Sequence, residues 1–322
     1  MYKSTEIYDD KPHEECGVFG IFDHNLSAVH EVYYGIFALQ HRGQESAGIT
    51  VTDGKEMETF RGMGLVTEVF RNLPEKEGHI GIGHVRYSTT GSSIPANVQP
   101  LQADSIDGPM ALAHNGNLVN TLNLRRRLLL KGSTFSTSMD TEVIIKLLAR
   151  SRRPTEEEKF KELMDEIHGA YAIVACTNKA LYGCRDPFGY RPLVLGKTET
   201  GWVLASEMPA LDAIDAKFVR DILPGEIVSI DDNGVRSTMY CPVDAHKHGI
   251  CSFEYIYFAR PDSIMNGQDI YQARLNMGRK LWEECRFDGD VVMSVPDSGN
   301  VAALGYAAAS GIPFVEGLLK NK

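Results

Sequence analysis

The sequence has few cysteines and no closely spaced pair of them. Its six cysteines, at positions 16, 176, 184, 241, 251 and 285, are scattered over 322 residues and form no Cys-x-x-Cys motif. This spacing is not that of a disulfide framework and indicates a reducing compartment. No apolar run approaches the ~20 residues that cross a bilayer, and residues 1–15 lack the apolar core of a secretory signal. These absences predict a cytoplasmic protein with no membrane partner.

The chain also has fewer basic than acidic residues. The formal net charge is −10, from 33 lysines and arginines against 43 acidic residues. Such a balance disfavours nucleic acid as a partner, and the basic cluster at 125–127 lies in a helical pattern typical of a solvated face. A hydrophobic content of 43% over this length is enough for two domains with sizeable cores.

One cysteine, Cys16, opens the first apolar run of the chain. The preceding residues, 1–15, are rich in acidic, lysine and tyrosine side chains and show no core-building pattern. If they are a propeptide that maturation removes, Cys16 becomes N-terminal. Its α-amine, with a pKa near ~8, can then act as the base for its own thiol, with a pKa near ~8.5. Taken alone, Cys16 is better interpreted as a buried residue opening a strand; the motifs below reverse that balance.

Short apolar strands lie at both ends of the region before residue 240, with helices between them. Apolar patterns predict strands at 16–22, 47–51, 79–85, 110–113, 171–176, 181–184, 193–195, 202–205 and 227–230. Helical spacing predicts helices at 28–39, 118–130, 140–148 and 155–167, the last with residues 156–159 and 161 on a solvated face. This order indicates helices packed outside a pair of sheets.

The composition changes at the polar, turn-rich segment 241–249, where we place a domain junction. Beyond it the patterns predict a helix at 269–285, a buried strand at 290–295, a helix at 301–310 and a second strand at 312–315. Together they form one βαβ unit, the start of a parallel sheet. Residues 241–322 are fewer than the ~100–150 of a usual domain, so we expect this second domain to be incomplete.

Four segments with chemistry-bearing residues follow Cys16. They are Leu39-Gln40-His41-Arg42-Gly43, Gly83-His84-Val85-Arg86, His114-Asn115-Gly116-Asn117 and Met139-Asp140-Thr141-Glu142. Their order and spacing resemble the glutaminase domain of N-terminal-nucleophile (class II) glutamine amidotransferases. Two later stretches, Cys251–Ser263 and Ser294–Gly299, are similar to the amidophosphoribosyltransferase family within that class. The resemblance covers almost everything from Cys16 to Lys322 and is more specific than any single motif.

The resemblance implies an α+β fold and a set of glutaminase residues. For residues 16–240 it implies the four-layer αββα sandwich of N-terminal-nucleophile hydrolases, and for 241–322 the start of an α/β phosphoribosyltransferase domain. For catalysis it implies that Cys16 is the nucleophile and that Asn115 and Gly116 are the oxyanion donors. For substrate binding it implies that Arg86 holds the α-carboxylate of glutamine and Asp140 its α-ammonium. Gly43 would allow a close approach of the backbone to the thiol.

Several of these residues also have structural interpretations. Asn-Gly favours a tight hairpin turn on its own, so Asn115 and Gly116 could close a hairpin, from which a backbone N–H is also easily aimed. Asp140 could cap the helix that follows it. Because the mechanism needs no imidazole, we interpret three histidines as structural hydrogen-bonding residues: His41, His84 and His114.

The second half carries the metal predictions. Asp297 and Ser298 follow a predicted parallel strand, where α/β sheets bind ligands. The resemblance implies that this loop contacts pyrophosphate and Mg²⁺, with Ser298 at the matching position; capping of the next helix is the alternative. Cys251 matches the first ligand of the family's iron–sulfur branch, whose [4Fe–4S] cluster needs four thiolates. The sequence shows no match for the other three.

The implied reaction releases the amide nitrogen of glutamine as ammonia and transfers it to phosphoribosyl pyrophosphate. The products are 5-phosphoribosylamine, glutamate and pyrophosphate, the entry step of purine synthesis. The resemblance also implies a homo-oligomer and purine nucleotides as feedback inhibitors. The paired-Asp and Gly-Thr loop that cradles the ribose phosphate in phosphoribosyltransferases has no match before Lys322, so we expect this chain not to perform the transfer by itself.

Two alternatives stay open. Another class II amidotransferase, such as glucosamine-6-phosphate synthase, shares the first domain but should lack the segments Cys251–Ser263 and 295–299. A catalytically silent regulatory module is the second alternative, because Cys16 has no free amine while residues 1–15 precede it.

Overall fold

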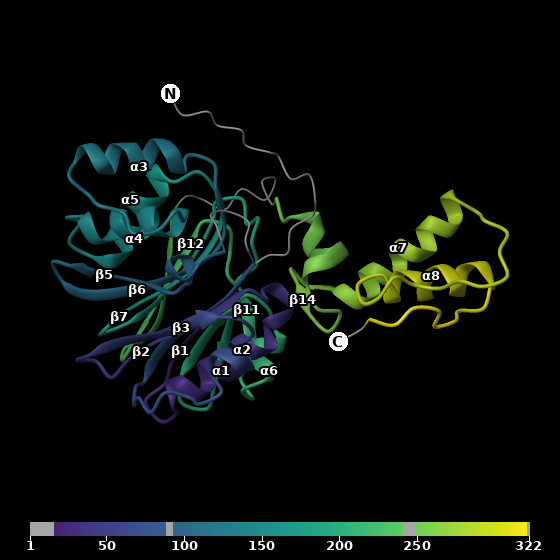
Figure 1. The fold of residues 1–322 in the computed structure, drawn as a ribbon, viewed down its shortest axis with the longest axis horizontal. Coiled ribbons are helices and arrows are strands. Elements are labelled where there is room, and N and C mark those ends of the chain that lie inside the picture. The colour runs from purple at the N-terminus through teal and green to yellow at the C-terminus, as the bar shows by residue number, and fades with distance from the viewer. Residues whose placement is uncertain (1–15, 88–92, 241–248, 321–322) are drawn as a thin grey trace.

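Two stacked antiparallel sheets with helices on both outer faces form the larger part of the molecule (Figure 1). The computed structural model describes residues 16–87, 93–240 and 249–320. One sheet has seven strands in the order β11-β9-β10-β1-β4-β2-β3, and the other has six in the order β13-β12-β8-β7-β6-β5. This is the four-layer αββα sandwich that the resemblance implied, and that prediction is confirmed.

The bounds of the elements agree with most of the predicted strands and helices. The seven-stranded sheet contains β1 (Gly17–Phe22), β2 (Ser46–Thr52), β3 (Met57–Met63), β4 (Ile80–Arg86), β9 (Val194–Lys197), β10 (Trp202–Ala205) and β11 (Lys217–Asp221). The six-stranded sheet contains β5 (Leu101–Ser105), β6 (Gly108–Leu118), β7 (Gly169–Thr177), β8 (Leu181–Arg185), β12 (Glu226–Asp231) and β13 (Gly234–Met239).

Helices cover the outer face of each sheet. The seven-stranded sheet is covered by α1 (Ala28–Ala38), α2 (Val66–Val69) and α6 (Pro209–Asp212), and the six-stranded sheet by α3 (Thr121–Leu130), α4 (Asp140–Arg150) and α5 (Glu156–Glu166). Two single 3₁₀ turns, η1 (Gln40–Arg42) and η2 (Pro95–Asn97), connect elements.

Three apolar layers hold the sandwich together. The strand β1 is buried on both faces, because its alternate side chains enter different cores. Val18 and Phe22 lie between the two sheets, whereas Phe19 and Ile21 pack under α1. The third core lies between the six-stranded sheet and its helices and includes Phe160.

The segment 249–320 adds a smaller helical unit, which extends away from the sandwich in Figure 1. It contains a π-helix, η4 (Glu254–Phe258), a hairpin of β14 (Ile264–Met265) and β15 (Gln268–Asp269), and the helices α7 (Ile270–Glu284) and α8 (Asn300–Ser310). The helices α7 and α8 cross closely because Gly278 and Gly305 lie at the contact. A Cβ on either glycine would meet a backbone carbonyl of the other helix, that of Ala302 or Leu275.

The two strands predicted around α8 are largely absent. Segments 290–295 and 312–315 meet only in one parallel bridge, between Val292 and Phe314. Two backbone hydrogen bonds of 2.9 Å hold it, from Val292 N–H to the Pro313 carbonyl and from Val315 N–H to the Val292 carbonyl. The parallel direction was therefore predicted correctly, but a single bridge does not make a strand.

Two sequence predictions lie outside the described residues. They are the propeptide at 1–15 and all but the last residue of the domain junction at 241–249. Among the residues that the structure describes, no helix is long and apolar enough to cross a membrane.

Candidate active site

Cys16 lies at the entrance to β1, beside the end of β4. It is buried, and its Sγ lies 3.6 Å from the carbonyl oxygen of Tyr87. The antiparallel register pairs Gly17 with Val85. Cys16, one residue before Gly17, therefore lies opposite Arg86, one residue after Val85. The candidate nucleophile is thereby placed next to Arg86.

Arg86 and Asp140 are buried charges of opposite sign at the same end of the sandwich. Arg86 ends β4, and its Nη2 lies 3.5 Å from Sδ of Met139, the residue before Asp140. Its Nη1 lies 3.8 Å from a carboxylate oxygen of Glu45. Through this contact Arg86, the predicted partner of the α-carboxylate, lies beside the residue that precedes Asp140, the predicted partner of the α-ammonium.

Asp140 is the first residue of α4, and its carboxylate is held by three groups. It accepts hydrogen bonds from the backbone N–H groups of Leu118 at 3.1 Å and Thr141 at 2.8 Å, and His114 Nδ1 lies 3.6 Å away. Burial opposes ionisation, but His114 and the backbone N–H groups outweigh it and lower the pKa of Asp140. The capping alternative is wrong, because the N-cap is Met139 and makes no side-chain cap bond.

Asn115 and Gly116 lie within β6, paired with Ala172 and Tyr171 of β7. The hairpin alternative for them is therefore wrong. Asn115 is fully buried, and neither polar atom of its amide has a hydrogen-bond partner among the described residues. An unpartnered buried amide is costly unless something else satisfies it, which is what an oxyanion ligand would do.

Gly116 has a backbone conformation that only glycine adopts easily. Its φ is +147°, and a Cβ would collide with the carbonyl of Ala170. A glycine is also required at Gly43, where a Cβ would lie 2.6 Å from the backbone N and C of Arg86. The predicted close approach at Gly43 is thus directed at the end of β4.

The three histidines make hydrogen bonds in the surrounding framework. His84 Nε2 lies 3.1 Å from the carbonyl of His114 and links β4 of one sheet with β6 of the other. Burial is the main reason that the pKa of His84 falls to about 3, so its imidazole stays neutral. His41 Nε2 lies 2.9 Å from Glu207.

The loop with Asp297 and Ser298 lines a second cavity, of about 430 Å³. Basic residues from four parts of the chain line it too: His41 and Arg42 of η1, Arg260, Arg274 of α7, and Lys320. The capping alternative for this loop is wrong, because Gly299 is the N-cap of α8 and no side chain caps it. Mg²⁺ is held by few protein oxygens together with substrate phosphates. Ser298 and Asp297 both line this cavity, and hydroxyl and carboxylate oxygens are donors of the kind that Mg²⁺ takes.

The described cysteines do not form a metal centre. No group of three or more His, Cys, Asp or Glu that could hold a metal occurs among the described residues. Cys251 is half-buried, and its backbone N–H donates to the Tyr190 carbonyl at 3.3 Å. Burial raises the pKa of Cys176 to about 12 and also raises that of Cys184, so both remain thiols. Residue 241 lies outside the described part of the chain.

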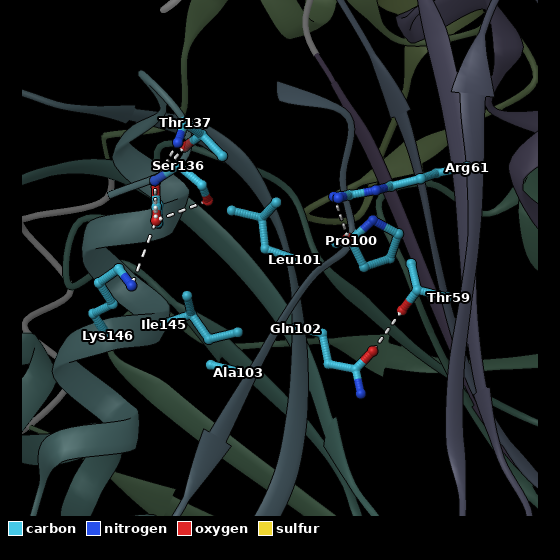
Figure 2. A pocket seen from close by; sticks show the side chains of 11 residues that line it. Thr59, Arg61, Pro100, Leu101, Gln102, Ala103, Ser136, Thr137, Ile145 and Lys146 are labelled. Carbon is cyan, nitrogen blue, oxygen red and sulfur yellow. Dashed lines mark hydrogen bonds and ion pairs between the residues drawn. The ribbon is translucent and has the colours of Figure 1, made fainter. Parts of the chain in front are cut away.

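A further pocket of about 260 Å³ lies between β3, β5 and α4 (Figure 2). Its polar groups are engaged with one another. Arg61 Nη1 donates to the Val98 carbonyl at 2.6 Å, and the Glu142 carboxylate accepts the N–H groups of Ser136 and Thr137. This pocket contains none of the predicted site residues, but Glu142 holds the loop that leads into Asp140.

Sequence reasoning missed the buried charged side chains that lie next to the predicted site residues without being among them. Glu142, Arg42 and Glu254 lie inside the quoted motifs but received no role, and Glu207 lies in none of them. Glu207 gave no signal at all, since an isolated Glu between two apolar segments is usually exposed.

Comparison with known proteins assigns the family. A family model for a glutamine amidotransferase domain matches residues 84–213. An amidophosphoribosyltransferase of Methanocaldococcus jannaschii is 45% identical over 325 residues, which is 95% of this chain and 69% of that relative. The chain belongs to the amidophosphoribosyltransferase family. Another member, from Mycobacterium tuberculosis, is 44% identical and covers 97% of this chain and 60% of its own length.

Solved structures of amidophosphoribosyltransferases agree in fold. One, titled as the allosteric regulatory enzyme of purine biosynthesis, matches with a TM-score of 0.91 at 45% identity, over 95% of this chain and 66% of that one. The glutamine phosphoribosylpyrophosphate amidotransferase of B. subtilis, complexed with ADP and GMP, matches with a TM-score of 0.89 at 45% identity, over 95% and 67%. The chain spans 57 to 69% of the length of the curated relatives it matches.

Proposed function

We propose that this chain provides the glutaminase chemistry of an amidophosphoribosyltransferase. The observation that carries the proposal is the placement of buried Arg86 next to Cys16 and in contact with Met139, the residue before buried Asp140. A bidentate guanidinium suits the α-carboxylate of an amino acid, and an ionised carboxylate suits its α-ammonium. The side-chain amide of a glutamine held at its α-carbon end can then extend toward the thiol.

In the proposed reaction the α-amine of a mature, N-terminal Cys16 takes the proton of its own thiol. The thiolate attacks the side-chain carbonyl carbon of glutamine, and negative charge develops on the carbonyl oxygen. The Asn115 amide and the Gly116 N–H stabilise that charge, and one such donor is worth ~10²–10³ in rate. The amine returns the proton to the departing ammonia, and water then hydrolyses the thioester to glutamate.

The ammonia would attack C1 of phosphoribosyl pyrophosphate, displacing pyrophosphate and forming 5-phosphoribosylamine. The cavity beside Ser298 supports this second step with several cationic side chains for phosphate groups. Bound Mg²⁺ would neutralise pyrophosphate oxygens, with Ser298 as its protein ligand. The glucosamine-6-phosphate synthase alternative is not favoured, because the similarity to amidophosphoribosyltransferases extends over 95% of the chain.

We assign no step to an iron–sulfur cluster. Cys251 supplies one thiolate where four are needed, and the described residues gather no further ligands around it. The ADP and GMP in the B. subtilis relative support purine nucleotides as regulatory ligands of the assembled enzyme, which we propose to be a homo-oligomer.

Replacing the proposed nucleophile tests the glutaminase reaction. We expect Cys16→Ala to abolish glutamate release from glutamine, whereas Cys285→Ala, at an exposed cysteine, should leave it unchanged. The measurement is made on protein whose N-terminal residue has been established as Cys16 by mass spectrometry. Glutamine hydrolysis that survives in Cys16→Ala would contradict the proposal. A silent regulatory module would show no hydrolysis in the unsubstituted protein either.

A further inference from the structure

A fully buried ion cluster joins three distant parts of the chain behind the glutamine site. Its centre is the guanidinium of Arg42, whose Nε donates to Glu207 and whose Nη2 donates to Glu254 at 2.6 Å. None of the three side chains has exposed surface. Arg42 belongs to η1, Glu207 lies between β10 and α6, and Glu254 begins η4 in the smaller helical unit.

Glu207 accepts hydrogen bonds both from the sandwich and from the smaller helical unit. His41 Nε2 lies 2.9 Å from one carboxylate oxygen, while the Arg260 backbone N–H and the Ser263 hydroxyl donate to the other at 3.0 and 2.7 Å. Burial opposes ionisation of Glu207, but Arg42 and His41 outweigh it and hold its pKa far below the usual range. Glu207 is therefore ionised, and both of its carboxylate oxygens are hydrogen-bonded, the condition under which a buried charge is stable.

The cluster fixes the backbone that lies against the catalytic residues. Arg42 is followed by Gly43, which packs against the backbone of Arg86, and Glu45 N–H donates to the Arg86 carbonyl at 3.1 Å. The side chain of Gln40 closes the same turn by donating to the Gly43 carbonyl. A displaced Arg42 would thus move Gly43 and the end of β4.

We propose that Glu254, together with Glu207, is a positioning residue for glutamine hydrolysis. It holds Arg42 by two N–H groups and so keeps Gly43 and Arg86 in place, although it lies outside the glutaminase sandwich. The hairpin strand β14, which follows η4, lies between the sheets and the α7–α8 pair in Figure 1. The glutamine site is therefore completed by the second half of the chain. This inference rests on the proposed glutaminase activity.

The test compares Glu254→Gln with Glu283→Gln, a matched removal of one carboxylate charge at an exposed pair with Lys280. Glutamine has nearly the shape of glutamate but leaves the buried guanidinium with one counter-charge fewer. We expect kcat/KM for glutamine to fall by about 10- to 100-fold in Glu254→Gln, mostly through KM, because misplacement of a substrate-holding group has this magnitude. The control should keep the unsubstituted values.

A labelling experiment separates positioning from unfolding. Alkylation of Cys16 by iodoacetamide, resolved from that of exposed Cys285 by peptide mass spectrometry, reports the reactivity of the thiol without using the glutamine pocket. By contrast, 6-diazo-5-oxonorleucine must occupy that pocket before it reacts. In Glu254→Gln we expect unchanged alkylation by the first and slower labelling by the second. Equal slowing of both reactions would overturn positioning in favour of a structural role. An unchanged kcat/KM for glutamine in Glu254→Gln, when the unsubstituted protein is active, would overturn the proposal altogether. If the unsubstituted protein hydrolyses no glutamine, the proposed function fails, and this inference fails with it.

Discussion

Arg86 and Asp140 show how single residues are prepared for a zwitterionic ligand. Both are buried, and each is already surrounded by groups that favour its charged form or fix its direction, such as the N–H groups of Leu118 and Thr141 at Asp140. A ligand with opposite charges at adjacent atoms can replace the water that such groups would otherwise require. We therefore expect the proposed site to select an amino-acid end group before any contact with its side chain.

Neutralising Asp140 should weaken glutamine binding. In Asp140→Asn we expect the KM for glutamine to rise by at least about tenfold, because a hydrogen bond to a charged group contributes ~1.5–3 kcal/mol. Steady-state kinetics of glutamate release measures it. Asp288→Asn, at an exposed aspartate, is the control. An unchanged KM in Asp140→Asn would remove Asp140 from the substrate site.

At the scale of residues, the sequence motifs identified the candidate site residues, but no sequence pattern predicted the contacts that support them. Arg42 stands in a quoted motif, but its partners Glu207 and Glu254 are 165 and 212 residues away along the chain. Lys159 shows the same limit. It was predicted on a solvated face, yet it is buried and its Nζ contacts Asp107 and Glu156 at 2.5 Å. Only the fold brings such partners together, and no local pattern encodes them.

Among the elements, the strands that sequence reasoning missed in the two large sheets share one position. They are β3, β5, β11 and β13, and each is an outermost strand of its sheet; the short hairpin strands β14 and β15 were missed as well. An edge strand has one neighbour and a more exposed surface, so it needs no apolar run; β11, for example, is largely exposed. The central strands β1, β4 and β7 are buried throughout or nearly so, and their apolar runs predicted them.

The strand β6 should tolerate no side chain at Gly116. Gly116→Ala combines a strained φ with a collision against the Ala170 carbonyl, so we expect it to cost at least ~1–3 kcal/mol more than Gly108→Ala. Gly108 is a matched control on the same strand, because its φ is +116° but nothing lies within 4 Å of its Cβ. Urea unfolding of both variants gives the difference. Equal losses would show that backbone conformation alone requires Gly116.

At the scale of the whole molecule, His84 links the two sheets and makes the free energy of unfolding depend on pH. The folded pKa is about 3, whereas an unfolded histidine titrates near ~6.5. Between these values the unfolded chain binds a proton that the folded chain does not. The contribution of His84 is therefore fully present above pH ~6.5 and is lost as the pH falls toward 3.

Denaturant unfolding at several pH values tests this dependence. Below pH ~6.5 we expect His84 to lower the free energy of unfolding by ~1.4 kcal/mol per pH unit. His84→Gln, which can still donate to the His114 carbonyl, should remove that component of the slope, whereas His168→Gln, at an exposed histidine, should retain it. Identical slopes in all three proteins would mean that His84 is protonated in the folded state.

The ion cluster around Arg42 sets a condition for reusing this fold. One use of the fold would be to fuse the sandwich to a new acceptor domain. Here a salt bridge joins the sandwich to the smaller helical unit, since Arg42 lies in η1 and Glu254 in η4. A chimera that keeps only the sandwich would bury a guanidinium beside one carboxylate instead of two. Its designer would have to supply a carboxylate from the new domain at the same place, or replace Arg42 and its pocket together.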